Sequence, residues 1–282
     1  MLELIESHGS FSGTQRVYRH QSQVIGLPMR FSVFMPSEAQ HWKVPALFFL
    51  AGLTCTEETF PIKAGAQRFA AEHGIALVAP DTSPRGAGVP GESDTWDFGV
   101  GAGFYVDASQ KPWSERYRMY SYVRDELREL VICKLPVDGE RLGIFGHSMG
   151  GHGALTLALR NPDIYRSVSA FAPIAAPMRC PWGEKAFNAY LGPDRDSWKQ
   201  YDASELVRRA ARRFEEGILI DQGLADQFLA QQLNPEVFKA ACKTANQPLT
   251  LRWHEGYDHG FFFVQSFIED HIRHHAGILL AK

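Results

Sequence analysis

Residues 141–154 read RLGIFGHSMGGHGA, in which an apolar run leads into Ser148, with Gly146 two residues before it and Gly150 two residues after it. This spacing matches the pattern G-x-S-x-G of a nucleophile elbow, a sharp strand-to-helix turn that exposes a serine hydroxyl. Glycine is needed on both sides because the neighbouring backbones approach too closely for a Cβ atom. Since glycine and serine are common residues, the surrounding sequence must decide whether the elbow is present.

Length and composition are those of an ordinary globular protein. The 282 residues are 45% hydrophobic and 22% charged, and the formal net charge is −3. We expect one domain over residues 1–282, and the small net charge gives no reason to expect nucleic acid or an anionic membrane as a partner. The chain starts with MLELIESHGSFSG, which has no apolar signal segment. Its cysteines are scattered, which argues against a zinc site or a disulfide scaffold and predicts reduced thiols in the cytoplasm.

Strand-like and helix-like segments alternate along the chain. Apolar runs predict strands at 28–36, 45–51, 75–80, 142–146, 165–173, 217–223 and 249–256. Helices are expected at 63–74, 116–134, 149–160, 235–245 and 260–275. From residue 45 onward this alternation predicts an α/β protein with a mostly parallel sheet and helices on both faces. Functional sites in such sheets lie beyond the carboxyl ends of the strands, and Ser148 follows one of these ends.

A serine nucleophile needs a histidine base and an acid that orients the histidine. In the hydrolase fold that carries a G-x-S-x-G elbow, the chain order is serine, acid, histidine. Asp226 follows the strand expected at 217–223, and His259 follows the strand expected at 249–256. Ser148, Asp226 and His259 therefore have the required order, and each lies beyond the end of a predicted strand.

Other residues compete for the acid and base roles. Asp221 lies within the end of its strand and Asp258 adjoins the histidine it would have to orient, so Asp226 is favoured over both. His147 leaves the elbow in a different direction from the serine. His152 lies one turn along the following helix, where local packing is expected.

The last predicted helix carries three closely spaced histidines, His271, His274 and His275. Their spacing of i, i+3, i+4 places them on one helical face. We expect a solvated surface cluster in preference to a metal site.

The tetrahedral intermediate of acyl transfer needs two backbone N–H donors. One is expected from Met149, directly after the nucleophile, and the other from Leu53, in the loop after the strand at 45–51. Cys55 lies two residues beyond Leu53, so its thiol is expected near the acyl pocket. A buried, inert cysteine is an equal alternative.

Two long segments, 81–115 and 173–200, interrupt the alternation of strands and helices. Both follow strands at the same edge of the sheet as Ser148, and long loops in compact domains are usually functional, so we expect them to form pocket walls. Their bulky side chains, candidates to close a pocket around a small acyl group, are Trp96, Phe98, Phe104 and Trp182.

Long stretches of the chain resemble the S-formylglutathione hydrolases, the esterase D family of α/β-hydrolases. The resemblance is carried by GLTCTEETF (52–60), APDTSPRG (79–86), WDFGVGAGFYVDAS (96–109), RYRMYSYVRDEL (116–127), PVDGERLGIFGHSMGGHGAL (136–155), CPWGEKAFNAYLG (180–192), DQGLADQFL (221–229) and GYDHGFFF (256–263). It implies an α/β-hydrolase fold without a large separate cap domain, the triad Ser148, Asp226 and His259, and an oxyanion hole from Leu53 and Met149.

The resemblance also implies the reaction, in which S-formylglutathione and water yield glutathione and formate during formaldehyde detoxification. No metal or organic cofactor is implied, and a cytoplasmic homodimer is compatible with the family. A general short-chain carboxylesterase, or a hydrolase of other acyl thioesters, is the alternative function. A catalytically silent binding module is disfavoured by the intact serine, acid and histidine.

Overall fold

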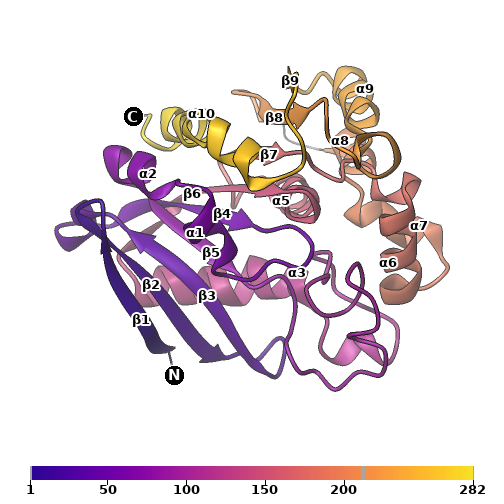
Figure 1. Cartoon of the computed structure of the whole chain (residues 1–282), viewed down its shortest axis with the longest axis horizontal. Coiled ribbons are helices and arrows are strands. Elements are labelled where there is room, and N and C mark those ends of the chain that lie inside the picture. Colours follow the sequence, from indigo (N-terminus) through magenta and orange to yellow (C-terminus); the bar gives the residue numbers. More distant parts are fainter. Residues whose placement is uncertain (1, 211–213, 282) are drawn as a thin grey trace.

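The computed structural model describes residues 2–210 and 214–281. All strands that it describes form one sheet in the order β1-β2-β3-β5-β4-β6-β7-β8-β9 (Figure 1). These strands are β1 Leu2–Ser10, β2 Gly13–Gln21, β3 Pro28–Met35, β4 Val44–Leu50, β5 Ala76–Pro80, β6 Val137–His147, β7 Ser167–Phe171, β8 Ile218–Gly223 and β9 Leu249–His254. The first three are antiparallel to their neighbours, whereas β5, β4 and the strands from β6 to β9 are parallel. We propose on this ground that the chain is a single domain.

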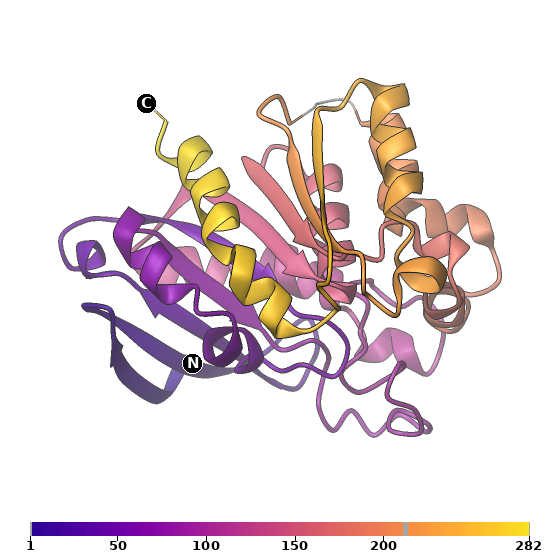
Figure 2. The same cartoon turned by 45° about the horizontal axis from the view of Figure 1, so that its top comes forward.

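Helices cover both faces of the sheet, as Figures 1 and 2 show for α10 and α5. Ser167 and Ser169 of β7 contact α10, whereas Ala170 of the same strand faces Gly151 of α5. Alternate side chains of a strand point to opposite faces, so α10 and α5 lie on opposite sides. The helices are α1 Thr59–Lys63, α2 Gln67–His73, α3 Met119–Ser121, α4 Arg128–Lys134, α5 Met149–Arg160, α6 Pro181–Leu191, α7 Arg195–Trp198, α8 Ala203–Arg209, α9 Pro235–Ala245 and α10 Phe261–Leu279. The α/β-hydrolase architecture without a separate cap is confirmed.

The predicted strands and the helices at 149–160 and 235–245 are confirmed. Two other expected helices are interrupted, and one hairpin was not predicted. The helix expected at 63–74 is two helices, α1 and α2, because Gly65 between them has a φ of +67°. The helix expected at 116–134 contains a π-helical turn, Tyr122–Leu127, between α3 and α4. Strands β1 and β2 were not predicted, since much of this hairpin is exposed and no continuous apolar run marks it.

The backbone is packed very closely around the elbow. A Cβ atom on Gly150 would lie 1.9 Å from the carbonyl oxygen of Leu50 in β4, and one on Gly146 would lie 2.3 Å from the carbonyl oxygen of Gly150. Between these glycines Ser148 has φ 59° and ψ −122°, a conformation that costs about 1–3 kcal/mol for a residue with a side chain. Its backbone N–H donates to the carbonyl of Phe171 in β7 at 3.0 Å, which helps to hold this turn in place.

The histidines of the last helix do not form the expected surface cluster. His271 and His275 are fully buried between α10 and the sheet. Ser169 bridges them, because its hydroxyl lies 2.8 Å from Nδ1 of His271 and 2.9 Å from Nε2 of His275. Burial lowers the pKa of both side chains. The surface cluster was expected because three polar residues on one helical face are usually solvated. Here serine hydroxyls of β7 form hydrogen bonds with the ring nitrogens of two of these histidines.

A third buried histidine lies on the opposite face of the sheet. His152 in α5 has no exposed surface, and its Nε2 lies 2.9 Å from the carbonyl oxygen of Phe104. Burial lowers the pKa of His152 to about 4. The ring is therefore neutral in the folded protein at neutral pH.

We expect the free energy of unfolding to fall as the pH drops below about 6.5, in part because of His152. Its pKa is about 4 in the fold and about 6.5 in an unfolded chain, so between these values only the unfolded state binds the proton. The stabilisation is complete above pH 6.5 and is lost toward pH 4, at up to about 1.4 kcal/mol per pH unit. Urea unfolding of His152→Gln, whose amide can still donate to Phe104, should show a shallower pH slope than the parent chain. Equal slopes would contradict this assignment.

Candidate active site

Ser148 lies at the N-terminal end of α5 and at the carboxyl edge of the parallel strands. Ser148 is 3% exposed, so the surrounding loops cover its hydroxyl. Met149 is the first residue of α5, and the first N–H groups of a helix have no acceptor within the helix. The N–H of Met149 is therefore available to an oxygen atom bound beside Ser148.

His259 and Asp226 are brought together by the loops after β9 and β8. Nδ1 of His259 lies 2.6 Å from Oδ2 of Asp226, whose carboxyl group has no exposed surface. The other oxygen of Asp226 accepts the N–H of Phe228 at 2.8 Å. These two contacts engage both oxygens of the carboxylate and hold it beside the imidazole ring.

The rival acid, Asp221, is engaged elsewhere. Its buried carboxyl group accepts two hydrogen bonds from Arg252, at 2.6 and 2.5 Å, and lies 3.2 Å from Nε2 of His271. Burial alone would raise the pKa of Asp221, but His271 and Arg252 hold it well below its usual range. Asp221 is therefore part of a structural ion pair. The third aspartate, Asp258, accepts the N–H of Gly260, just before α10, at 2.8 Å.

The loop after β4 lies against the elbow. A Cβ atom on Gly52 would lie 3.1 Å from Cβ of Ser148. In the same loop the N–H of Thr54 donates to Gly101 at 2.9 Å and that of Cys55 donates to Gly52 at 3.3 Å. These bonds bend the loop around Leu53, whose N–H is the proposed second donor.

A row of aromatic rings leads from His259 to the second long segment. Phe228 contacts His259 with ring centroids 5.0 Å apart, and Trp182 in α6 contacts Phe228 at 4.8 Å. Trp96, from the first long segment, packs edge-on against Trp182 at 5.5 Å. The two long segments thus meet beside His259, where their rings can form a wall of the substrate pocket.

The other pocket candidates make different contacts. Phe98 stacks on Tyr190 with ring centroids 4.7 Å apart, in an aromatic cluster that also holds Trp113. Phe104 is fully buried and packs near His152. No ring contact in the described residues links either of them to His259.

Cys55 is half-buried in the loop that follows β4. Burial raises the pKa of its thiol, and a hydrogen bond with Thr59 together with the nearby Lys63 and Arg85 charges opposes that rise. The thiolate needed for reaction is therefore scarce at neutral pH.

Two contributors to the site were missed from the sequence. Gln222 is fully buried, and its Nε2 donates to Oδ2 of Asp226 at 3.2 Å and to the carbonyl of Gly223 at 3.1 Å. Phe228 supplies both a backbone donor and an aromatic wall. Both belong to the stretch DQGLADQF, whose polar residues around Asp226 are the only signal the sequence offers.

His147 also lies in the site, though not in a base role. Its ring centroid is 4.6 Å from that of His259, and neither of its ring nitrogens has a hydrogen-bond partner within the described residues. Burial, and next the His259 charge, lower the pKa of His147 well below its ordinary value. A neutral ring therefore packs beside His259.

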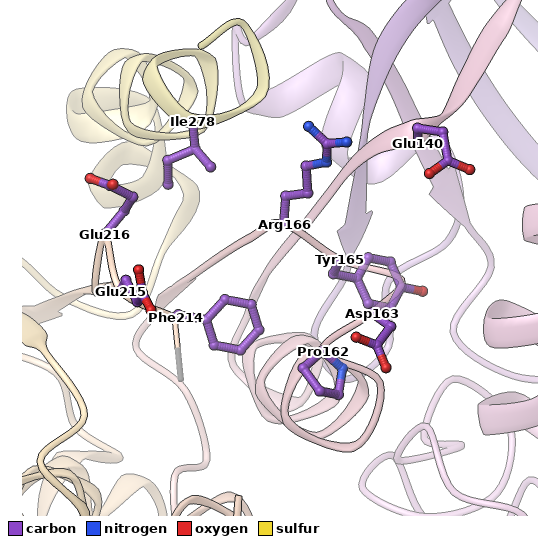
Figure 3. Close-up of a pocket in the computed structure, with 9 residues that line it drawn as sticks. All are labelled: Glu140, Pro162, Asp163, Tyr165, Arg166, Phe214, Glu215, Glu216 and Ile278. Atoms are coloured by element: carbon purple, nitrogen blue, oxygen red, sulfur yellow. The ribbon is translucent and has the colours of Figure 1, made fainter. Parts of the chain in front are cut away.

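A cavity of about 480 Å³ opens beside the paired histidine and aspartate. Its walls are formed by Ala225, Gln227, Phe228, Asp258, His259 and Gly260. A second cavity, of about 440 Å³, lies where β7 and β8 begin, at the opposite edge of the sheet from Ser148 (Figure 3). It is lined by Glu140, Pro162, Asp163, Tyr165, Arg166, Phe214, Glu215, Glu216 and Ile278. Its position separates it from the reaction site.

No helix in the described part of the chain has the length and apolar content that a membrane crossing requires. Among residues 2–210 and 214–281, no three His, Cys, Asp or Glu side chains are grouped so that they could hold a metal ion.

The sheet, the elbow and the histidine–aspartate pair define a serine hydrolase of the α/β-hydrolase class. The family model for Esterase matches residues 22–274. S-formylglutathione hydrolase from Rattus norvegicus is 54% identical over 281 residues, with 99% of each chain covered. S-formylglutathione hydrolase from Paracoccus denitrificans is 55% identical over 274 residues, with 97% of each covered. The solved structure of an S-formylglutathione hydrolase from Agrobacterium tumefaciens matches with a TM-score of 0.95 at 47% identity, over 98% of this chain and 99% of that one.

The chain belongs to the S-formylglutathione hydrolase family of esterases, and it is a hydrolase.

The contacts of the two aspartates predict opposite effects of two matched substitutions. Asp226→Asn should lower kcat by about 10³–10⁴-fold with little loss of stability, because the amide no longer holds His259 in the tautomer that accepts the serine proton. Asp221→Asn should lower the free energy of unfolding by about 2 kcal/mol, since it removes the buried carboxylate that pairs with Arg252 and leaves this cation only the more exposed Asp270. It should keep most of kcat. Steady-state kinetics and urea unfolding of both variants measure this. The reverse pattern would assign the acid role to Asp221.

Proposed function

We propose that this chain hydrolyses S-formylglutathione to glutathione and formate, with Ser148 as nucleophile, His259 as base and Asp226 as the acid that orients it. The identity of 54–55% over almost the whole length to two proteins named S-formylglutathione hydrolase carries the choice of substrate. The 2.6 Å contact between His259 and Asp226 supports the assignment of the base.

In the first half of the reaction, Oγ of Ser148 attacks the thioester carbonyl carbon while His259 accepts the hydroxyl proton. The N–H groups of Leu53 and Met149 stabilise the oxyanion. The carbon–sulfur bond then breaks, glutathione leaves with the proton from His259, and a formyl ester of Ser148 remains. A thiol, with a reference pKa near 8.5, leaves far more readily than an amine.

In the second half, a water molecule attacks the formyl ester and His259 accepts its proton. Formate leaves as the bond to Oγ breaks, and Ser148 regains its proton from His259. The side chains of this chain supply each proton transfer. The family resemblance supports two further proposals: the chain works in the cytoplasm, and two copies form a dimer. The small net charge of −3 gives no reason to expect a nucleic-acid partner.

Ser148→Ala should reduce kcat for S-formylglutathione by about 10⁵–10⁶-fold, because no other group at the elbow can form the acyl ester. Single-turnover mass spectrometry of the parent protein should detect a formyl adduct on the peptide that contains residue 148. A variant that keeps more than a per cent of the parent kcat, with contamination excluded, would refute the assignment of the nucleophile.

The size of the acyl group should govern kcat/KM, because Trp182 and Phe228 narrow the space beside His259. Each extra methylene must displace packed aromatic atoms, at about 1–3 kcal/mol, which lowers kcat/KM by about 10- to 100-fold. We expect a steep fall from formyl through acetyl to butyryl glutathione, partly restored in Trp182→Ala. Each rate is divided by that of uncatalysed hydrolysis, since formyl esters are intrinsically more reactive. A corrected series that is flat as far as butyryl would favour a general short-chain esterase or broad thioesterase.

A further inference from the structure

Lys63, the last residue of α1, lies beside the candidate active site without belonging to its catalytic groups. Its Nζ is 5.9 Å from the ring centroid of Phe261, at the start of α10. The Phe261 ring contacts His147 with centroids 5.6 Å apart, and His147 contacts His259 at 4.6 Å. Figure 2 shows α1 beside the N-terminal end of α10. This chain of ring contacts links the Lys63 ammonium group to the reacting histidine.

The loop that carries the proposed oxyanion donor also lies near Lys63. Helix α1 begins at Thr59, four residues after Cys55, and the Lys63 charge acts on the Cys55 thiol. Lys63 is therefore close to two elements that border the site, the loop after β4 and the start of α10. Its side chain is exposed, so the ammonium group is open to a bound molecule.

Lys63 has no ionic partner among residues 2–210 and 214–281. Within the described residues no carboxylate forms an ion pair with it, whereas two other cations near the site are paired. Arg85 lies 2.7 Å from Asp81, and Lys185 lies 2.5 Å from Asp97. Asp258 gives the cavity beside His259 a negative wall. An anionic substrate bound in this cavity therefore needs a nearby cation to offset the charge of Asp258.

A glutathione thioester has the chemistry that matches such a cation. The tripeptide carries a carboxylate at each end, and its reacting sulfur is on the central cysteine. When the thioester carbonyl is at Ser148, the carboxylates lie toward the rim of the site. We propose that the Lys63 ammonium group binds one of these carboxylates and so selects glutathione thioesters over neutral esters, an inference that rests on the proposed function.

The test compares an anionic and a neutral substrate in the same variant. Lys63→Met should raise KM for S-formylglutathione about 5-fold, leave its kcat within 2-fold, and leave kcat/KM for 4-nitrophenyl acetate unchanged. Lys63→Arg should restore most of the lost affinity. Added salt should lower kcat/KM for S-formylglutathione less in Lys63→Met than in the parent, because screening acts on the charge that the variant lacks.

The control is Lys43→Met, which removes an exposed positive charge just before β4, at the opposite edge of the sheet. It should change neither substrate's constants, which excludes an effect of net charge alone. Equal losses for both substrates in Lys63→Met would overturn the proposal, because they would show that Lys63 supports the loops, and so would unchanged constants for both. A parent protein that hydrolyses S-formylglutathione no faster than uncatalysed controls, while it cleaves 4-nitrophenyl acetate, would refute the proposed function itself and the role of Lys63 with it.

Discussion

The rest of the site depends on how closely helix α5 approaches the end of β4. At Gly150 even a methyl group would lie 1.9 Å from the Leu50 carbonyl oxygen, so this position in the first turn of α5 admits only glycine. This approach forces Ser148 into a left-handed turn with φ 59° and brings the loop after β4 against it, at Gly52. The proposed nucleophile and both proposed oxyanion donors therefore take their positions from one close backbone contact between α5 and the end of β4.

Charge is distributed around this contact so that one carboxylate remains free to orient a histidine. Asp221 is held by Arg252 and His271, which leaves Asp226 to receive Nδ1 of His259. The neighbouring His147 is neutral because it is buried. A second positive ring beside His259 would oppose the imidazolium that we propose forms there, and burial of His147 removes that conflict.

The sequence predicts the parallel part of this fold well, because strands buried on both faces read as apolar runs and because glycines bracket the elbow. It also predicts that Ser148, Asp226 and His259 lie at the same edge of the sheet, because each follows the end of a predicted strand. It fails where tertiary contacts reverse a local preference. The polar hairpin β1–β2 joins the sheet as an outer extension with little apolar signal, and His271 and His275 are buried because serines of β7 happen to face them. Gln222 could not be recognised, since its role depends on the path of the loop after β8.

The positions of the reacting groups along the chain have a consequence for synthesis. Ser148 lies near the middle of the sequence, whereas His259 follows β9, the last strand to leave the ribosome. With His259 as the proposed base, a nascent chain that stops before β9 lacks the group that accepts the serine proton, so it cannot turn over an ester. On this proposal, hydrolysis begins only after β9 and the loop that carries His259 have been translated and docked, so ester cleavage would report chains that have completed the sheet.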